Sequence, residues 1–253
     1  MLSCNMKLNS IKTQLILFLT VFAFYLYIAD KDVMFLLSTV VSVVSAVVLD
    51  SVIIYLKEKK FFITESSVIT GLIIGYVLYS QQSLWIFLLA SLLAIGSKYF
   101  IAVNKKHLFN PAALGIFVSI LLFHATTQWK GTYLWYILVP VGVYFVYKIR
   151  KIEIIAGYFL AFLVLFGTQA FIQRINFFNI FGYLSYFYVF IMVIEPKTTP
   201  IRPPVKFMFG MCLCILIFIL TETGARFDVE LCSLLVLNAA VPLLDKLTRK
   251  KGA

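Results

Sequence analysis

Three short stretches of the sequence place small or polar residues where they could bind a ligand. The first reads ESSVITGLIIG and carries Gly71 and Gly75, four residues apart. On a helix these glycines share one face, which lets another backbone or a flat ligand approach closely. Close packing between two helices also accounts for them, because small residues are enriched at such contacts, and we favour that interpretation.

The second stretch reads KKHLFNPAALG, in which Asn110 directly precedes Pro111. Asparagine at the cap position and proline at the first helical position predict that a helix begins here. The free N–H groups at the start of a helix in or near a membrane also suit carbonyl or anionic groups of a ligand. Asn110 is therefore a candidate helix cap and a candidate hydrogen-bonding partner for a bound ring system.

The third stretch reads EPKTTPIRPPVK, begins at Glu195 and contains four of the seven prolines of the chain. Prolines at this density exclude regular structure and hold the intervening residues in a stiff loop. We predict a functional role for Glu195, Thr198 and Thr199. For Lys197 and Lys206 we predict lipid-facing positions at the edge of the membrane.

A further acidic residue, Asp50, lies inside an apolar segment about two helical turns from Lys57. Carboxylates within the membrane are costly and mark ion or proton paths, so Asp50 is a candidate for such a path. The alternative is an aspartate near the interface that extends toward the lysines.

The remaining reactive side chains do not form a site of their own. Cys212 and Cys214 are two residues apart, and on a helix they would point to different faces. With only His107 and His124 in the chain, a bis-histidine haem is not expected. We therefore expect no metal, haem or iron–sulfur cluster on this chain alone, and we find no phosphate-binding glycine loop or Ser-His-Asp arrangement in the sequence.

The elements that must position these residues are apolar helices. Hydrophobic residues make up 62% of the chain and charged residues only 13%, about half of what soluble domains carry. Apolar runs of this length indicate membrane-spanning helices, and we predict an all-α polytopic membrane protein with about ten of them. They lie near residues 13–29, 33–56, 66–81, 83–103, 109–124, 132–147, 153–171, 177–195, 205–221 and 229–245. The third and fifth are short and are expected to be broken, tilted or only partly spanning.

The basic residues predict the orientation of the chain. If the N-terminus is cytoplasmic, only Lys31, Lys130, Arg174 and Arg226 fall outside, which leaves 18 of the 22 lysines and arginines on the inside. This asymmetry agrees with the positive-inside rule, so we predict that both termini are cytoplasmic. The net charge of +11 is thereby explained by a lipid membrane, and no nucleic-acid partner is expected.

Ten helices divide into five and five, and an odd number in each half requires the second half to enter the membrane from the opposite side. We therefore expect one transmembrane domain, residues 1–253, made of inverted halves at 1–128 and 129–253. Transporter-like folds of this kind place their sites where helices interrupted by glycine or proline meet.

Three motifs in this order, ESSVITGLIIGYVL, HLFNPAALG and MVIEPKTTP ahead of FMFG, resemble one membrane family. The chain is similar to the RnfD protein of the Rnf electron-transport complex and the NqrB protein of the sodium-translocating NADH:quinone reductase, best over residues 61–124 and 177–215. The resemblance implies a flavin-associated electron-transfer subunit, rather than a complete enzyme, of a complex that translocates Na⁺ or H⁺ across a prokaryotic cytoplasmic membrane. Its partners would be other membrane subunits. Its cofactors would be non-covalent riboflavin, FMN or both, near Gly71, Gly75, Asn110, Glu195, Thr198 and Thr199.

In this family one FMN is esterified to a threonine in a Ser/Thr-Gly-Ala-Thr motif near the outer face of the membrane. Ala125 and Thr126 match the end of that motif, but Phe123 and His124 replace the Ser/Thr and the glycine. Losing the flexible glycine should hinder the attaching enzyme. We therefore favour a polar helix end at Thr126 over covalent FMN.

Two other functions fit the same scaffold, because a fold does not determine a function. One is a small-solute channel or transporter without a redox cofactor. The other is a membrane scaffold that seats partner subunits or an extracytoplasmic flavoprotein. The absorption spectrum of the purified protein separates the flavin-binding function from both.

Overall fold

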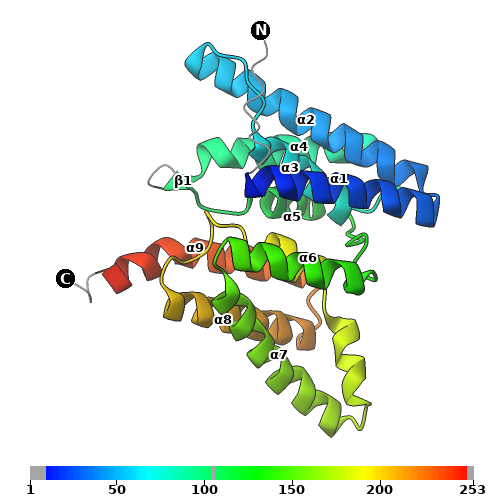
Figure 1. Cartoon of the computed structure of the whole chain (residues 1–253), viewed down its shortest axis with the longest axis vertical. Helices are drawn as coiled ribbons and strands as arrows, with labels where there is room; N and C mark the ends of the chain where they lie inside the picture. Colours follow the sequence, from blue (N-terminus) through cyan, green and yellow to red (C-terminus); the bar gives the residue numbers. More distant parts are fainter. Residues whose placement is uncertain (1–9, 104–105, 250–253) are drawn as a thin grey trace. The chain divides into compact units, whose positions relative to one another are not determined.

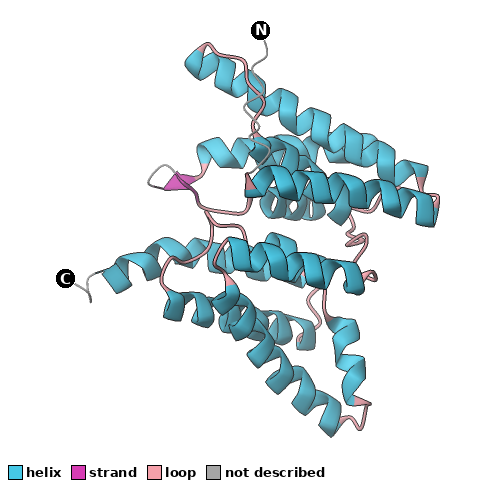
Figure 2. Cartoon of the chain, viewed as in Figure 1, coloured by secondary structure: helices cyan, strands magenta, loops and turns pink. Residues whose placement is uncertain are grey.

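The computed structural model describes residues 10–103 and 106–249, and these are almost entirely helical (Figures 1 and 2). The chain divides into two compact units. Unit 1 comprises Met1–Ala102 and Pro111–Gly131, and unit 2 comprises Val103–Asn110 and Thr132–Ala253. The inverted relation expected between the two halves of the sequence stays a prediction.

Unit 1 contains five helices: α1 (Ile11–Asp30), α2 (Val33–Glu58), α3 (Glu65–Val77), α4 (Leu84–Phe100) and α5 (Pro111–Phe123). By length and composition, α1 and α2 are long and apolar enough to cross a membrane. In contrast, α3 and α5 have 13 residues each, or about 20 Å, which is shorter than the hydrocarbon core. The prediction that the third and fifth helices are short is confirmed.

Short polar side chains determine where the first three helices begin. Ser10, Asp32 and Thr64 precede α1, α2 and α3, and each side chain accepts a hydrogen bond from a backbone N–H three residues later. These bonds satisfy donors that a helix leaves free in its first turn. The turns between the apolar helices of unit 1 are therefore fixed by local sequence.

Unit 2 contains α6 (Trp135–Lys148), α7 (Ile152–Ile172), α8 (Pro203–Glu222) and α9 (Val229–Arg249). Of these, α7 and α8 are long and apolar enough to span a membrane. They pack closely because Gly157 lies against the backbone of Phe207 and Gly210 lies against the backbone of Ile154. Two short strands, β1 (Ala102–Val103) and β2 (Lys106–His107), lie between α4 and α5 in the sequence.

The eighth predicted helix, at residues 177–195, is not a continuous α-helix, and that expectation was wrong. A 3₁₀ segment, η1 (Phe177–Tyr183), ends in an extended residue, Leu184. A π-helical segment follows, η2 (Tyr188–Met192), in which the N–H of Val193 reaches back five residues to the carbonyl of Tyr188. Aromatic and β-branched residues have low helix propensity, and Pro196 disfavours the α conformation of the residue before it. Within the described residues the structure therefore has nine α-helices.

The predicted orientation of the termini is not settled by the fold. Lys7, Lys105, Lys250 and Lys251, which contribute to the charge count, lie outside the described residues. The cytoplasmic location of both ends stays a prediction.

Candidate functional site

The proline-rich segment, residues 195–204, connects η2 to α8 in unit 2. As predicted, its first part forms no helix or strand, and α8 begins only at Pro203. Thr198 and Thr199 are nevertheless almost completely buried, with 2% and 3% of their surfaces exposed. A buried irregular backbone requires hydrogen-bond partners from elsewhere in the fold, and unit 2 supplies them from three directions.

The first partner is Asn238, a buried residue of α9. Its side-chain oxygen accepts a hydrogen bond from the backbone N–H of Asn110 at 3.0 Å, and its amide nitrogen donates to the carbonyl of Thr198 at 3.0 Å. The side chain of Asn110 donates to the carbonyl of Met192, at the end of η2, at 3.3 Å. Two asparagines thus connect η2, α9 and the proline-rich segment.

The second partner is Lys151, which precedes α7 and is only 6% exposed. Its ammonium donates to Thr199 Oγ1 at 2.5 Å and to the carbonyl of Pro200 at 3.1 Å. The hydroxyl of Thr199 also donates to the carbonyl of Glu195 at 2.9 Å. Thr199 therefore holds the turn of the segment closed and places a buried cation beside it.

The third partner is His107, whose Nε2 lies 2.9 Å from Glu195 Oε1. The His107 side chain is 4% exposed and the Glu195 side chain 24% exposed. This contact fixes one oxygen of the carboxylate and leaves the other available.

Two oxygen atoms of the proline-rich segment have no hydrogen-bond partner among the described residues, although both are buried. They are Glu195 Oε2 and Thr198 Oγ1. Buried polar atoms are almost always paired, so an orphaned carboxylate oxygen and an orphaned hydroxyl three residues apart indicate a place for a polar ligand.

The structure therefore brings together four of the residues predicted from the sequence: Asn110, Glu195, Thr198 and Thr199. Three others, His107, Lys151 and Asn238, belong to the same cluster but were not predicted as site residues. For Asn238 a signal existed, because a lone asparagine in an apolar membrane helix needs a partner. Lys151 offered no signal, because it follows Arg150 in a basic turn that the positive-inside rule already explains.

One prediction for the proline-rich segment was wrong. Lys206 does not face lipid but is 8% exposed, and its ammonium donates to the carbonyl of Arg150 at 2.6 Å. It also lies 3.4 Å from a carboxylate oxygen of Glu153. A buried ammonium needs such partners, and α7 supplies them.

In unit 1, Gly71 and Gly75 lie on the face of α3 that packs against α2. A Cβ atom on Gly71 would lie 2.5 Å from the Cα of Val43, and one on Gly75 would lie 2.7 Å from the Cα of Thr39. The two helix backbones are thus in close contact, which accounts for both glycines by packing. The cofactor role predicted for them stays a prediction.

Asp50 is also in unit 1 and is only 1% exposed. Its carboxylate accepts hydrogen bonds from Lys98 Nζ at 2.9 Å, the hydroxyl of Tyr99 at 2.7 Å and the hydroxyl of Thr64 at 2.5 Å. Lys57, the expected interfacial neighbour, instead lies 4.6 Å from the centre of the Tyr99 ring. The carboxylate is held by a cation of α4 and by two hydroxyl groups.

The loop after α5 pairs with the chain that leaves α3, and Thr126 lies in this loop. The carbonyl of Thr126 accepts from the N–H of Tyr79 at 3.0 Å, and its N–H donates to the side chain of Gln82 at 3.1 Å. His124 takes a left-handed backbone conformation with φ 52°. The Thr126 side chain is exposed, on a backbone that these hydrogen bonds hold in place.

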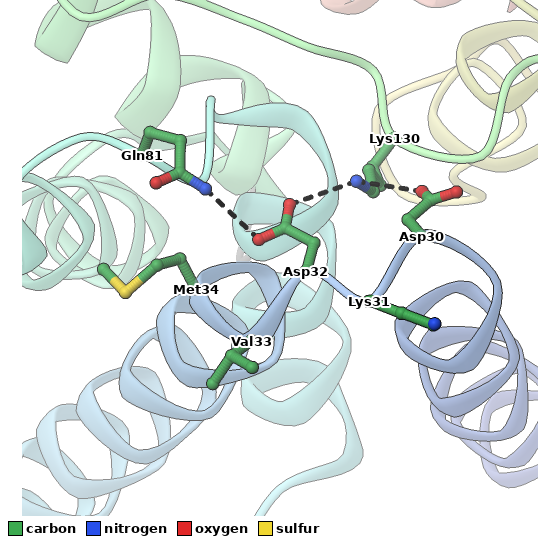
Figure 3. A pocket seen from close by; sticks show the side chains of 7 residues that line it. All are labelled: Asp30, Lys31, Asp32, Val33, Met34, Gln81 and Lys130. Atoms are coloured by element: carbon green, nitrogen blue, oxygen red, sulfur yellow. Dashed lines mark hydrogen bonds and ion pairs between the residues drawn. The ribbon is translucent and has the colours of Figure 1, made fainter.

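The same loop ends at an ion-pair cluster beside a pocket of about 450 Å³ (Figure 3). Lys130 Nζ lies 3.0 Å from Asp30 and 3.1 Å from Asp32, the two acids in the turn between α1 and α2. Burial alone would raise the pKa of Asp32. The Phe35 N–H, the Ser80 hydroxyl and Lys130 outweigh it, so this pKa lies below its usual value.

For Lys130 the balance of effects is similar. Burial alone would lower its pKa, but the hydrogen bonds and charges of Asp30 and Asp32 raise it above its usual value. In the described part of the chain, no group of three or more histidine, cysteine, aspartate or glutamate side chains could hold a metal ion.

The apolar helices and the buried, irregular polar segment define a polytopic α-helical membrane protein in which broken helices carry a polar site. The sequence matches the model of the NQR2, RnfD, RnfE family over residues 2–133 and again over residues 121–253. The chain belongs to this family, which confirms the resemblance drawn from the three motifs.

Among individual relatives, the chain is similar to the RnfD-type protein of the ion-translocating oxidoreductase complex of Actinobacillus succinogenes. The two are 32% identical over 98 residues. The match covers 38% of this chain and 27% of the relative, so the chain corresponds to well under two thirds of that protein.

Proposed function

We propose that the chain is a membrane component of an ion-translocating oxidoreductase complex, in which it holds a flavin non-covalently and passes electrons through it. The family supports the type of complex, and the name of the Actinobacillus relative agrees with it. The observation that carries the flavin proposal is the pair of buried oxygens without partners, Glu195 Oε2 and Thr198 Oγ1. Other subunits and a prokaryotic cytoplasmic membrane belong to the same proposal.

The chemistry of these residues fits a flavin. Its ring system has an N–H group that donates hydrogen bonds and several oxygen and nitrogen atoms that accept them. A carboxylate oxygen accepts, whereas a threonine hydroxyl can do either, so Glu195 and Thr198 suit opposite kinds of atom on the ring. When bound, the flavin supplies reversible electron transfer, and the protein supplies burial, orientation and hydrogen bonds.

The neighbouring residues would position the site and adjust its charge. Asn110 and Asn238 hold η2 and the proline-rich segment in register, so that the orphaned oxygens stay close together. The ammonium of Lys151, buried beside Thr199, would favour electron density gained by a bound ring.

For the ion path we keep Asp50, the buried carboxylate of unit 1, as the proposed residue. Its contact with Lys98 lets a cation compete with the ammonium for the carboxylate. In the assembled complex, Asp50→Asn should leave electron transfer intact and reduce ion transport. Unchanged ion transport at equal protein content would remove Asp50 from the path.

The flavin proposal is tested by comparing Thr198→Val with Thr168→Val, a matched change at an exposed threonine of α7. Both variants are purified in mild detergent, and flavin is measured by absorption per mole of folded protein. We expect Thr198→Val to lose most of the bound flavin and Thr168→Val to retain it. Glu195→Gln should behave like Thr198→Val.

Equal flavin content in all these variants would contradict the assignment of the site. A colourless wild-type protein that is fully folded would instead favour a transporter without a redox cofactor or a membrane scaffold.

A further inference from the structure

A second, apolar groove lies in unit 2 between α6 and α7 and has a volume of about 600 Å³. The two helices share a tight turn at residues 149–151 and diverge from it, as Figure 1 shows. Its walls and floor include Pro140, Val143, Tyr144, Ile155, Phe159 and Phe190. None of its lining residues is charged, so an occupant must be mainly apolar.

Two features explain why the groove exists. α6 has only 14 residues, or about 21 Å, so it covers less of the membrane thickness than α7, which has 21 residues. Gly142 holds α6 against Phe190 in η2, because a side chain at this position would collide with the ring. One face of α6 is thus fixed on η2, and the face toward α7 is left uncovered.

The turn at one end of the groove is positively charged. Lys148 and Arg150 are exposed, and the ammonium of Lys148 lies 5.6 Å from the centre of the Tyr144 ring. The nearby acid, Glu153, is already paired with Lys206, which also binds the carbonyl of Arg150. The turn is therefore anchored to α8, while two cations remain at the mouth of the groove.

We propose that this groove binds the acyl chain of an anionic phospholipid, with the phosphate of its headgroup at Lys148 and Arg150. The apolar walls match the chain, and basic residues between membrane helices attract anionic headgroups. Tyr144 and Tyr147, with 43% and 69% of their surfaces exposed, lie where the chain meets the headgroup, a position that aromatic residues favour. This site does not depend on flavin binding.

The test measures the unfolding temperature of the full chain, stripped of lipid in detergent, with added dioleoyl phosphatidylglycerol, dioleoyl phosphatidylcholine or inorganic phosphate. For the wild type we expect the largest stabilisation from phosphatidylglycerol and none from inorganic phosphate. Ala156→Trp, which fills the groove from an exposed position of α7, should abolish the effect of phosphatidylglycerol. Leu160→Trp, at an exposed position one turn further along, should behave as the wild type.

Charge is tested separately with the double variant Lys148→Gln and Arg150→Gln. Because each cation near an anionic membrane surface contributes about fivefold, the apparent affinity for phosphatidylglycerol should fall by roughly 25-fold. If Ala156→Trp fails to fold, Val143→Trp fills the same groove from α6. Equal stabilisation of the wild type by both lipids would overturn the proposal, and so would a groove-filling variant that keeps the full effect of phosphatidylglycerol.

Discussion

The side-chain oxygen of Asn238 accepts a hydrogen bond from the backbone N–H of Asn110 at 3.0 Å, although 128 positions separate the two residues in sequence. Its amide nitrogen donates to the carbonyl of Thr198, so one side chain satisfies a buried donor and a buried acceptor at once. This geometry makes Asn238 the residue on which the shape of the proposed flavin site depends most.

Replacing Asn238 by alanine should therefore destabilise unit 2. Each backbone group left unsatisfied in the interior costs about 1–3 kcal/mol of the free energy of unfolding. Asn238→Asp keeps the acceptor and should cost less than Asn238→Ala. Asn179→Ala, at an exposed asparagine of η1, serves as the control and should change stability by less than about 0.5 kcal/mol. Equal stability of the Asn238→Ala and Asn179→Ala proteins would contradict this role.

The glycines of α3 give a second prediction. Gly71→Ala should lower the free energy of unfolding by about 1–3 kcal/mol, because the added methyl group would lie 2.5 Å from the backbone of α2. Gly96→Ala in α4 meets nothing nearer than 3.9 Å and should be neutral or stabilising, since alanine favours a helix. Denaturant titration of both proteins measures the difference, and a Gly71→Ala protein as stable as Gly96→Ala would show that the helices are not in close contact.

A third prediction concerns the buried pair of Asp50 and Lys98. Removing one partner of a buried ion pair costs about 3–5 kcal/mol, and Lys98, at 13% exposure, should place Asp50→Leu at the lower end of this range. Asp50→Leu combined with Lys98→Leu should be less destabilised than Asp50→Leu alone, because no uncompensated charge remains. Strictly additive losses in the double-mutant cycle would mean that the two side chains do not interact.

The cluster of Asp32 and Lys130 predicts a pH dependence (Figure 3). Because the pKa of Asp32 is lowered by folding, its contribution is present above about pH 4 and is lost as the pH falls through the folded value. Because the pKa of Lys130 is raised, its contribution is present below about pH 10 and is lost as the pH rises through the folded value.

Asp32→Asn should therefore flatten the acid limb of a plot of unfolding temperature against pH. Glu58→Gln, at an exposed acid near the end of α2, should leave that limb unchanged. An acid limb of the same steepness in Asp32→Asn and the wild type would contradict the role of this carboxylate.

Much of the fold follows from the sequence because a membrane helix needs a long apolar run. Nine of the ten predicted segments correspond to α-helices whose ends agree within about four residues. The exception is the segment that contains η1 and η2, where the apolar run is as long as elsewhere. Its hydropathy predicts burial but does not distinguish an α-helix from 3₁₀ and π turns.

The site was predictable only where local chemistry was unusual. Glu195, Thr198 and Thr199 were recognised because prolines surround them, and Asn110 because it precedes Pro111. Lys151 was missed, and Lys206 was wrongly assigned to the lipid face, because charge counting treats every basic residue near a helix end alike. Their burial depends on Thr199 and Glu153, and neither contact has a local sequence pattern.

The measurement that tests the central proposal most directly is the flavin content of the wild-type protein. The protein would be purified from cells that also make the flavin-attaching enzyme, and its absorption recorded before and after denaturation, followed by a denaturing gel under ultraviolet light. We predict a yellow protein that releases its flavin on denaturation and gives no fluorescent band. A folded but colourless protein would contradict the proposed flavin site, and a fluorescent band that disappears in Thr126→Val would contradict the non-covalent attachment.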